Sequence, residues 1–432
     1  MGTVLINNVF LLPMDGRGVV EDAQVLVSGS SIVYAGSAGP LPEGFVPERT
    51  IDGQGGVVMP GLVNCHTHAA MTLLRSYADD LPLMRWLNEA VWPLEDRMEG
   101  EDIYWGTLLC CLEMIRGGVT TFADMYFFMD EAARAVERSG LRASLSRGLI
   151  GNGPTAEKGL VESRELVQRW HGAADGRITV MLGPHAPYTC PPSYLARVIE
   201  LSGELGVGIH IHLAETLAEV TEIKEKYGTT PVDLMLKTGL FERPVLAAHC
   251  VHLTPDDIAV LAAHKVGVAH NPESNMKLGS GIAPVNALLQ AGVRVGIGTD
   301  GAASNNDQDI FGEMRSAALL AKVAALDPTV LPAPQVLHMA TAGGAAALGL
   351  AGTGVLAPGY RADLILVNIH QPHLTPRHDL AAHLVYAARA ADVILTMVDG
   401  SILWADGRFT TLDPEEVMAQ ANKRAGRLVG PR

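Results

Sequence analysis

Short apolar stretches rich in β-branched residues alternate with longer amphipathic stretches through the middle of the chain, about residues 57–354. Apolar runs bounded by turn residues are typical of buried strands, whereas apolar residues recurring every three or four positions are typical of helices. The expected strands are 57–64, 119–124, 142–149, 178–185, 207–213, 245–249, 266–270 and 293–300. Helical segments between them include 101–116, 131–139, 192–205, 217–227 and 309–325.

This alternation predicts an α/β fold, specifically a (β/α)8 TIM-type barrel. An open doubly wound sheet is the alternative. No Gly-x-Gly-x-x-Gly opens a helix after the first strand, and the sequence has no phosphate-binding loop. Folds that bind nucleotide cofactors are therefore disfavoured.

The two ends of the chain have a different pattern, with short extended runs separated by turn residues. Near the C-terminus, Asp399-Gly400 stands between two apolar runs and predicts a tight hairpin. We expect residues 1–56 and 355–432 to form one small β-sandwich domain built from both termini. Residues 57–354 would form the barrel domain.

Composition and charge narrow the functional classes. The chain has 432 residues, 48% hydrophobic and 18% charged, which is typical of a globular protein with a sizeable core. Its net charge is −15 and it has no block of Lys or Arg, so nucleic acid and anionic membranes are not expected as partners. The N-terminal sequence lacks the features of a signal peptide, and no apolar run approaches 18 residues. A cytoplasmic location is expected.

Polar residues recur at the ends of the predicted strands. Because the carboxyl ends of barrel strands share one rim, residues far apart in sequence would meet there. His66 and His68 end the first strand and point to the same face, since side chains alternate along a strand. The other strand-end residues are Arg147, His185, His212, His249, His270 and Asp300.

A metal site is the interpretation that best explains this set. We predict His66, His68, His212 and Asp300 as ligands of one divalent metal ion per subunit. Three imidazoles and a carboxylate suit Zn²⁺ with one position left for water, although Fe²⁺ or Mn²⁺ would also fit. Barrels that hold two ions often use a carboxylated lysine on the fourth strand, and the segment ITVMLGPH contains none.

Two further residues are candidates for proton chemistry. Glu215 follows His212 by three positions and could move protons between water and a substrate nitrogen. His249 could hold the attacking water. His210 lies on the same face as His212 but deeper, so we expect it behind the ligands, while His252 and His270 are weaker candidates.

The motifs PGLVNCHTH, HLAET, AAHCVH, AHNPESNMKLG and GTDGAASNN make the chain resemble the amidohydrolase superfamily over essentially its full length. Within that superfamily, WLNEAVWPLEDR, SRGL, GPHAPYTC and NPESNMKLGSGIAPV are similar to the 5-methylthioadenosine/S-adenosylhomocysteine deaminases. The resemblance implies Glu95 on the ribose hydroxyls, His185 on the purine and Arg147 near the 5′ substituent. It also implies that Ser304 lines the pocket. A further arginine of some members is missing here, and Lys158 is the nearest cation.

The expected function is therefore metal-dependent hydrolytic deamination of adenosine derivatives to an inosine-type product and ammonia. Glu215, His249 and Asp300 would carry the chemistry, and Glu215 and Asp300 would also contact the substrate. The alternatives are a related guanine or cytosine deaminase, a triazine hydrolase, or a barrel retained as a non-enzymatic assembly protein. The sequence does not decide the preferred 5′ substituent. It is compatible with a homo-oligomer but does not decide the oligomeric state.

Overall fold

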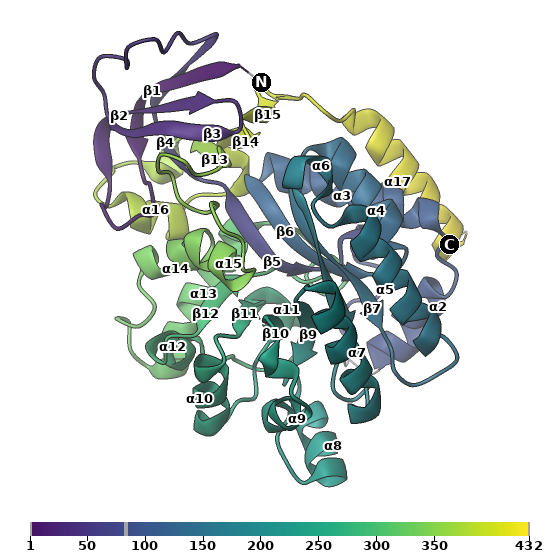
Figure 1. The fold of residues 1–432 in the computed structure, drawn as a ribbon. Coiled ribbons are helices and arrows are strands. Elements are labelled where there is room, and N and C mark those ends of the chain that lie inside the picture. Colours follow the sequence, from purple (N-terminus) through teal and green to yellow (C-terminus); the bar gives the residue numbers. More distant parts are fainter. Residues whose placement is uncertain (1, 82–84, 431–432) are drawn as a thin grey trace.

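The computed structural model describes residues 2–81 and 85–430, and its centre is a parallel barrel (Figure 1). Eight strands follow one another around it in chain order, which confirms the predicted barrel. They are β5 (Leu62–Thr67), β6 (Val119–Tyr126), β7 (Arg142–Leu149), β8 (Ile178–Pro184), β9 (Ile209–Leu213), β10 (Val245–His249), β11 (Gly267–His270) and β12 (Arg294–Ile297). The last strand returns to the first, where the Asp300 N–H donates to the His66 carbonyl at 2.9 Å.

Helices cover the outside of the barrel and side chains of the strands fill its inside, so that all eight residues of β6 are buried. The longer ones are α3 (Gly100–Arg116), α4 (Met129–Ser139), α5 (Ala156–Trp170), α7 (Pro192–Leu205), α8 (Leu217–Tyr227), α9 (Pro231–Thr238), α10 (Pro255–Ala263) and α13 (Ile310–Ala325). Shorter ones are α2 (Trp92–Glu95), α6 (Ala173–Gly176), α11 (Pro272–Lys277), α12 (Val285–Gln290), α14 (Ala333–Met339), α15 (Ala342–Ala347) and α16 (Leu380–Tyr386). No helix within the described residues is long and apolar enough to cross a membrane.

Strands from both termini form a second, mixed sheet beside the barrel, where the purple and yellow-green ends of the chain meet in Figure 1. Its order is β16 (Arg408–Phe409), β15 (Ser401–Ala405), β14 (Val393–Val398), β13 (Leu364–Val367), β4 (Arg49–Pro60), β1 (Thr3–Leu11), β2 (Val20–Ser28) and β3 (Ser31–Ser37). The predicted hairpin at Asp399-Gly400 joins β14 to β15. The sheet is continuous, and apolar residues from β1, β2, β13 and β14 share a small core of their own.

The predicted strand at 57–64 is two strands in the structure. Residues 57–60 belong to β4 and pair with β13, and the chain enters the barrel only at Leu62. The change of sheet therefore falls at Gly61, later than the boundary predicted at residue 57. A Cβ atom at Gly61 would lie 2.1 Å from the Thr120 side chain, so this crossing needs glycine.

The C-terminal helix α17 (Pro414–Val429) leaves the terminal sheet and packs on α3 at the side of the barrel (Figure 1). Asp102 near the start of α3 is buried, and the Arg427 guanidinium donates to its carboxylate. The same carboxylate caps α3 by accepting the Glu99 N–H at 2.8 Å. The C-terminus is thereby tied to the barrel.

Candidate active site

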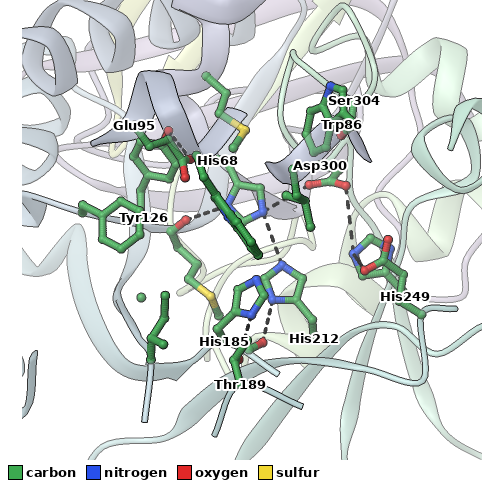
Figure 2. Close-up of a pocket in the computed structure, with 18 of the residues that line it drawn as sticks. His68, Trp86, Glu95, Tyr126, His185, Thr189, His212, His249, Asp300 and Ser304 are labelled. Carbon is green, nitrogen blue, oxygen red and sulfur yellow. Dashed lines mark hydrogen bonds and ion pairs between the residues drawn. The ribbon is translucent and has the colours of Figure 1, made fainter. Parts of the chain in front are cut away.

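A pocket opens at the carboxyl ends of the barrel strands (Figure 2). The long connection between β5 and α3 supplies one wall through the π-helical turn η2 (Trp86–Val91) and α2. Residues at or after the strand ends supply the rest, including His68, Tyr126, Gly148, His185, His212, Glu215, His249, Asp300 and Ser304.

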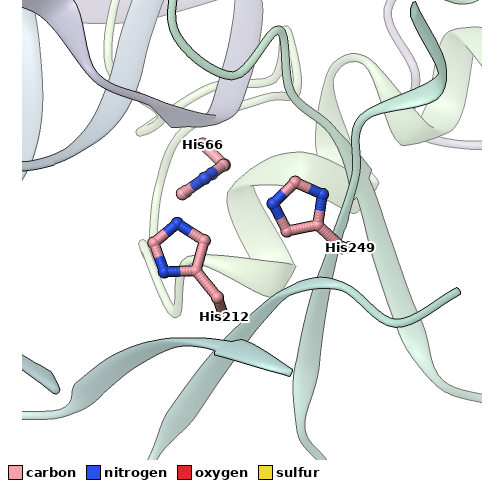
Figure 3. Close-up of side chains that lie close together, drawn as sticks. All are labelled: His66, His212 and His249. Atoms are coloured by element: carbon pink, nitrogen blue, oxygen red, sulfur yellow. The ribbon is translucent and has the colours of Figure 1, made fainter. Parts of the chain in front are cut away.

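The four predicted metal ligands meet at this pocket. Nε2 of His66 and Nε2 of His68 lie 3.6 and 3.3 Å from Asp300 Oδ1. Nε2 of His212 lies 3.3 Å from Nε2 of His68. His249 also approaches, since the ligand atoms of His66, His212 and His249 lie within 4.8 Å of one another (Figure 3).

Hydrogen bonds on the far side of each ring turn Nε2 toward the common point (Figure 2). Nδ1 of His68 lies 2.6 Å from the Met125 carbonyl, and Nδ1 of His212 lies 2.7 Å from the His185 carbonyl. A carbonyl only accepts, so both Nδ1 atoms carry hydrogen and both Nε2 atoms keep a free electron pair. Ligating histidines are commonly held in this way.

His66 shows that the donor set fits a metal ion. Its Nδ1 lies 2.9 Å from Nε2 of His210, which therefore sits behind the ligand as the sequence indicated. Its Nε2 is buried and has no hydrogen-bond partner among the described residues. Burial, reinforced by the neighbouring histidines, lowers the pKa of His66 well below its ordinary value, so the ring is neutral. A buried, neutral and unpartnered imidazole nitrogen is suited to coordinate a cation.

Two carboxylates and one imidazole face each other beside this cluster. Nε2 of His249 lies 3.9 Å from Glu215 Oε2 and 4.0 Å from Asp300 Oδ2. Its Nδ1 lies 2.9 Å from Asn275 Oδ1, which orients the ring. Burial raises the pKa of Glu215, whereas for Asp300 the effect of burial is outweighed by His68 and His249, and its pKa is lowered. The two acids therefore differ in their tendency to bind a proton.

The pocket wall on the His68 side holds a third carboxylate (Figure 2). Glu95 lies at the end of α2, and Oε1 of its side chain accepts a hydrogen bond of 2.6 Å from the Tyr126 hydroxyl. His185 also lines the pocket, with Nδ1 at 2.9 Å from Thr189 Oγ1. Burial lowers the pKa of His185 to about 4, so its ring is neutral. Ser304 lines the pocket beside Asp300.

Arg147 does not join these residues. It is not among the residues that line the pocket, because strand alternation directs Gly148 into the pocket and turns Arg147 outward. Its Nε donates to Glu162 of α5 at 2.8 Å, and its guanidinium lies 5.1 Å from the centre of the Phe127 ring. Lys158 pairs with the same Glu162 at 3.4 Å and is exposed. Among residues 2–81 and 85–430, no lysine or arginine lines the pocket.

Several residues that act in the site were not predicted from the sequence. Tyr126 and Thr189 orient pocket residues through contacts that bring separate segments together. Trp86 and Trp92 form part of the pocket wall. Both stand in the WLNEAVWPLEDR motif, which suggested the family but gave these two residues no role. Of the residues missed, Tyr126 had a usable signal in the sequence, since it lies just beyond a predicted barrel strand.

Comparison with known proteins gives consistent matches over the whole chain. The sequence matches the amidohydrolase family over residues 57–403. It is 60% identical, over 99% of both chains, to a 5-methylthioadenosine/S-adenosylhomocysteine deaminase of Pelotomaculum thermopropionicum. The fold is similar to a zinc-bound adenosine deaminase of Xanthomonas campestris, with a TM-score of 0.94, 36% identity and 99% coverage of both chains. It is also similar to a zinc complex of an atrazine chlorohydrolase of Arthrobacter aurescens, with a TM-score of 0.90 and 27% identity, covering 98% of this chain and 100% of that one.

Proposed function

Because this chain belongs to the amidohydrolase family, we propose that it is a metal-dependent deaminase of adenosine derivatives, with 5-methylthioadenosine and S-adenosylhomocysteine as substrates. The full-length identity to named deaminases supports this assignment. The observation that carries it is the pairing, in one pocket, of a histidine–carboxylate cluster with a separate carboxylate, Glu95, in the pocket wall. The cluster suits hydrolysis and Glu95 suits the ribose.

A single divalent ion, zinc in our proposal, would be held by His66, His68, His212 and Asp300. The converging Nε2 atoms and the unpartnered nitrogen of His66 support this choice. When bound, such an ion supplies Lewis-acid activation of water at neutral pH. We assign His249 to the water instead of the ion, because its Nε2 lies between the Glu215 and Asp300 carboxylates.

The protein side chains then handle the protons. Deamination adds the oxygen of water to C6 of the purine and releases the amino group as ammonia, so protons must leave the water and reach nitrogen. Asp300 takes a proton from the attacking water while His249 holds the oxygen. Glu215 protonates the adjacent ring nitrogen, and burial keeps its pKa raised toward the range in which a carboxyl both gives and takes protons.

The remaining pocket residues recognise the nucleoside. Glu95 accepts hydrogen bonds from the two ribose hydroxyls, and His185 and Ser304 contact the base side of the pocket. Apolar and aromatic side chains, including Trp86, Phe127 and Ile150, line the space that is left. This lining suits a 5′ thioether, and no lysine or arginine of the described chain lines it to pair with an amino-acid carboxylate.

An ammonia-release assay over a substrate panel tests the proposal. The panel compares adenosine, 5-methylthioadenosine and S-adenosylhomocysteine with guanine, cytosine and a chlorinated triazine. We expect an adenosine derivative to give the highest kcat/KM. If guanine or the triazine outperforms every adenosine derivative, the substrate assignment is wrong and the hydrolytic site serves another compound.

A further inference from the structure

Tyr126 is the last residue of β6 and forms part of the pocket wall. Its side chain is buried and its hydroxyl donates to Glu95 Oε1 at 2.6 Å. Within residues 2–81 and 85–430, no other group forms a hydrogen bond or ion pair with the Glu95 carboxylate. Hydrogen bonds from a hydroxyl to a carboxylate are short and strong, so this contact decides where the carboxylate lies.

Glu95 relies on this contact, because no other polar group of the described residues orients its side chain. It ends the single-turn helix α2, which follows the π-helical turn η2, in the long connection from β5 to α3. Burial raises the pKa of Glu95, while the hydrogen bond from Tyr126 acts in the opposite direction and favours the charged form. Without the hydroxyl, the side chain would be free to rotate and would carry its charge at a higher cost.

The strand that carries Tyr126 also orients a predicted metal ligand, His68, which follows β5. The carbonyl of Met125 accepts from Nδ1 of His68 at 2.6 Å, and the next residue is Tyr126. Figure 2 shows Glu95, Tyr126 and His68 together on one side of the pocket. Two consecutive residues of one buried strand therefore set the position of the imidazole and of the carboxylate, and so the separation between them.

We propose that Tyr126 is a positioning residue that selects ribosides, because its hydroxyl holds Glu95 at a fixed separation from the metal-binding histidines. A nucleoside with both ribose hydroxyls spans that separation, with its base at the histidine cluster and its sugar on Glu95. A substrate that lacks a hydroxyl leaves part of the carboxylate unpaired. This inference rests on the proposed function and adds the group that makes the sugar contact selective.

The test is Tyr126→Phe, which removes one oxygen and keeps the ring. For adenosine and 5-methylthioadenosine we expect kcat/KM to fall about tenfold, mainly through a higher KM, since one hydrogen bond to a charged group is lost. For 2′-deoxyadenosine the fall should be clearly smaller, so the preference for the ribose form shrinks. In a Glu95→Ala background, Tyr126→Phe should change kcat/KM less than twofold, because the group it positions is absent.

Tyr34→Phe is the matched control, since the Tyr34 hydroxyl donates to the Ser37 carbonyl in the terminal sheet, at 2.9 Å. It should leave all substrates unchanged. The inference is overturned if Tyr126→Phe lowers activity equally on ribose and 2′-deoxyribose substrates, if it loses metal, or if its effect persists in the Glu95→Ala background. Wild-type protein that deaminates no adenosine derivative would instead reject the proposed function itself.

Discussion

At the scale of residues, the site depends on groups that stand behind the reacting ones. The His68 and His212 rings are set by carbonyls of neighbouring strands, and His249 is set by Asn275. Such partners are fixed by the barrel, so the orientation of each ring is decided before any ligand binds. The roles of individual side chains can then be separated by substitution.

Substitutions of Glu215 and of His212 should impair activity for different reasons. Glu215→Gln keeps the shape of the side chain but cannot take up a proton, so kcat should fall about 10²-fold or more while the metal stays bound. His212→Ala removes a ligand and should lose metal together with activity. Elemental analysis of wild-type protein should give about one ion per chain. Full activity in the Gln variant, or two tightly bound ions in the wild type, would contradict these roles.

Arg147 tests whether the 5′ substituent meets a cation. Since its guanidinium pairs with Glu162 and stacks on Phe127, Arg147→Met should destabilise the protein by about 1 kcal/mol. The ratio of kcat/KM for 5-methylthioadenosine to that for S-adenosylhomocysteine should not change. A loss confined to S-adenosylhomocysteine would show that Arg147 reaches the amino-acid tail.

At the scale of elements, the corner between β9 and α8 supports the proton-carrying residue. Glu219 in the first turn of α8 is buried, and its carboxylate accepts the N–H groups of Ala214 and Glu215, both at 2.9 Å. Ala214 has a φ of 51°, a left-handed conformation that is unusual outside glycine. The Glu219 carboxylate therefore stabilises a strained turn that directs Glu215 into the pocket.

The same corner should make stability depend on pH. Burial raises the pKa of Glu219 to about 7 from its ordinary value of 4.5. A folded-state pKa above the unfolded one favours the protonated folded protein, so the contribution of Glu219 is full below about pH 4.5 and is lost as the pH rises through about 7.

Urea unfolding of wild type and Glu219→Gln between pH 5 and 8 measures this effect. The stability of the wild type relative to the variant should fall by about 1–3 kcal/mol over that range. The carboxylate oxygen that Glu219→Gln replaces changes the free energy of unfolding by the same amount at every pH, so it does not alter the slope. A pH-independent difference would mean that Glu219 titrates at its ordinary pKa.

The spacing of apolar residues predicted most helices and strands, because turn residues mark their ends in the sequence. The segments 142–149, 192–205 and 217–227 were predicted and match β7, α7 and α8 residue for residue. The π-helical turn η2 was not predicted, although its apolar residues Leu87, Ala90 and Val91 recur at helical spacing. Strand alternation could not say that Arg147 finds a partner on α5, because that contact depends on how the helix packs.

The candidate site was predicted where strand ends carry the residues, and missed where the contacts span elements. His66, His68, His212 and Asp300 needed only the barrel topology to be brought together. The bond from Tyr126 to Glu95 joins residues 31 positions apart and depends on the path of an irregular connection. Such pairings follow from tertiary packing and leave no periodic pattern.

At the scale of the whole molecule, a buried ion cluster joins the barrel to the terminal sheet. Arg142 at the start of β7 donates to Asp363 at 2.9 Å and to Asp399 at 2.7 Å. The three side chains are at most 6% exposed. Truncating Arg142 would leave buried Asp363 without its cation and Asp399 with only Arg361, whose Nη1 lies 3.4 Å from Asp399 Oδ1.

We therefore expect Arg142→Met to lower the free energy of unfolding by about 3–5 kcal/mol. Arg85→Met is the control, since Arg85 and Glu89 form a solvent-exposed pair on one helical turn and should contribute far less to stability. Urea denaturation of both variants gives the comparison. Equal effects would show that the cluster does not hold the two sheets together.

Metal-dependent deamination is tested most directly by a product analysis of purified, zinc-loaded protein with 5-methylthioadenosine. We predict one ammonia for each molecule of 5-methylthioinosine, loss of both products after chelation, and recovery when zinc is restored. Release of free adenine, or deamination that persists after the metal has been removed, would contradict it.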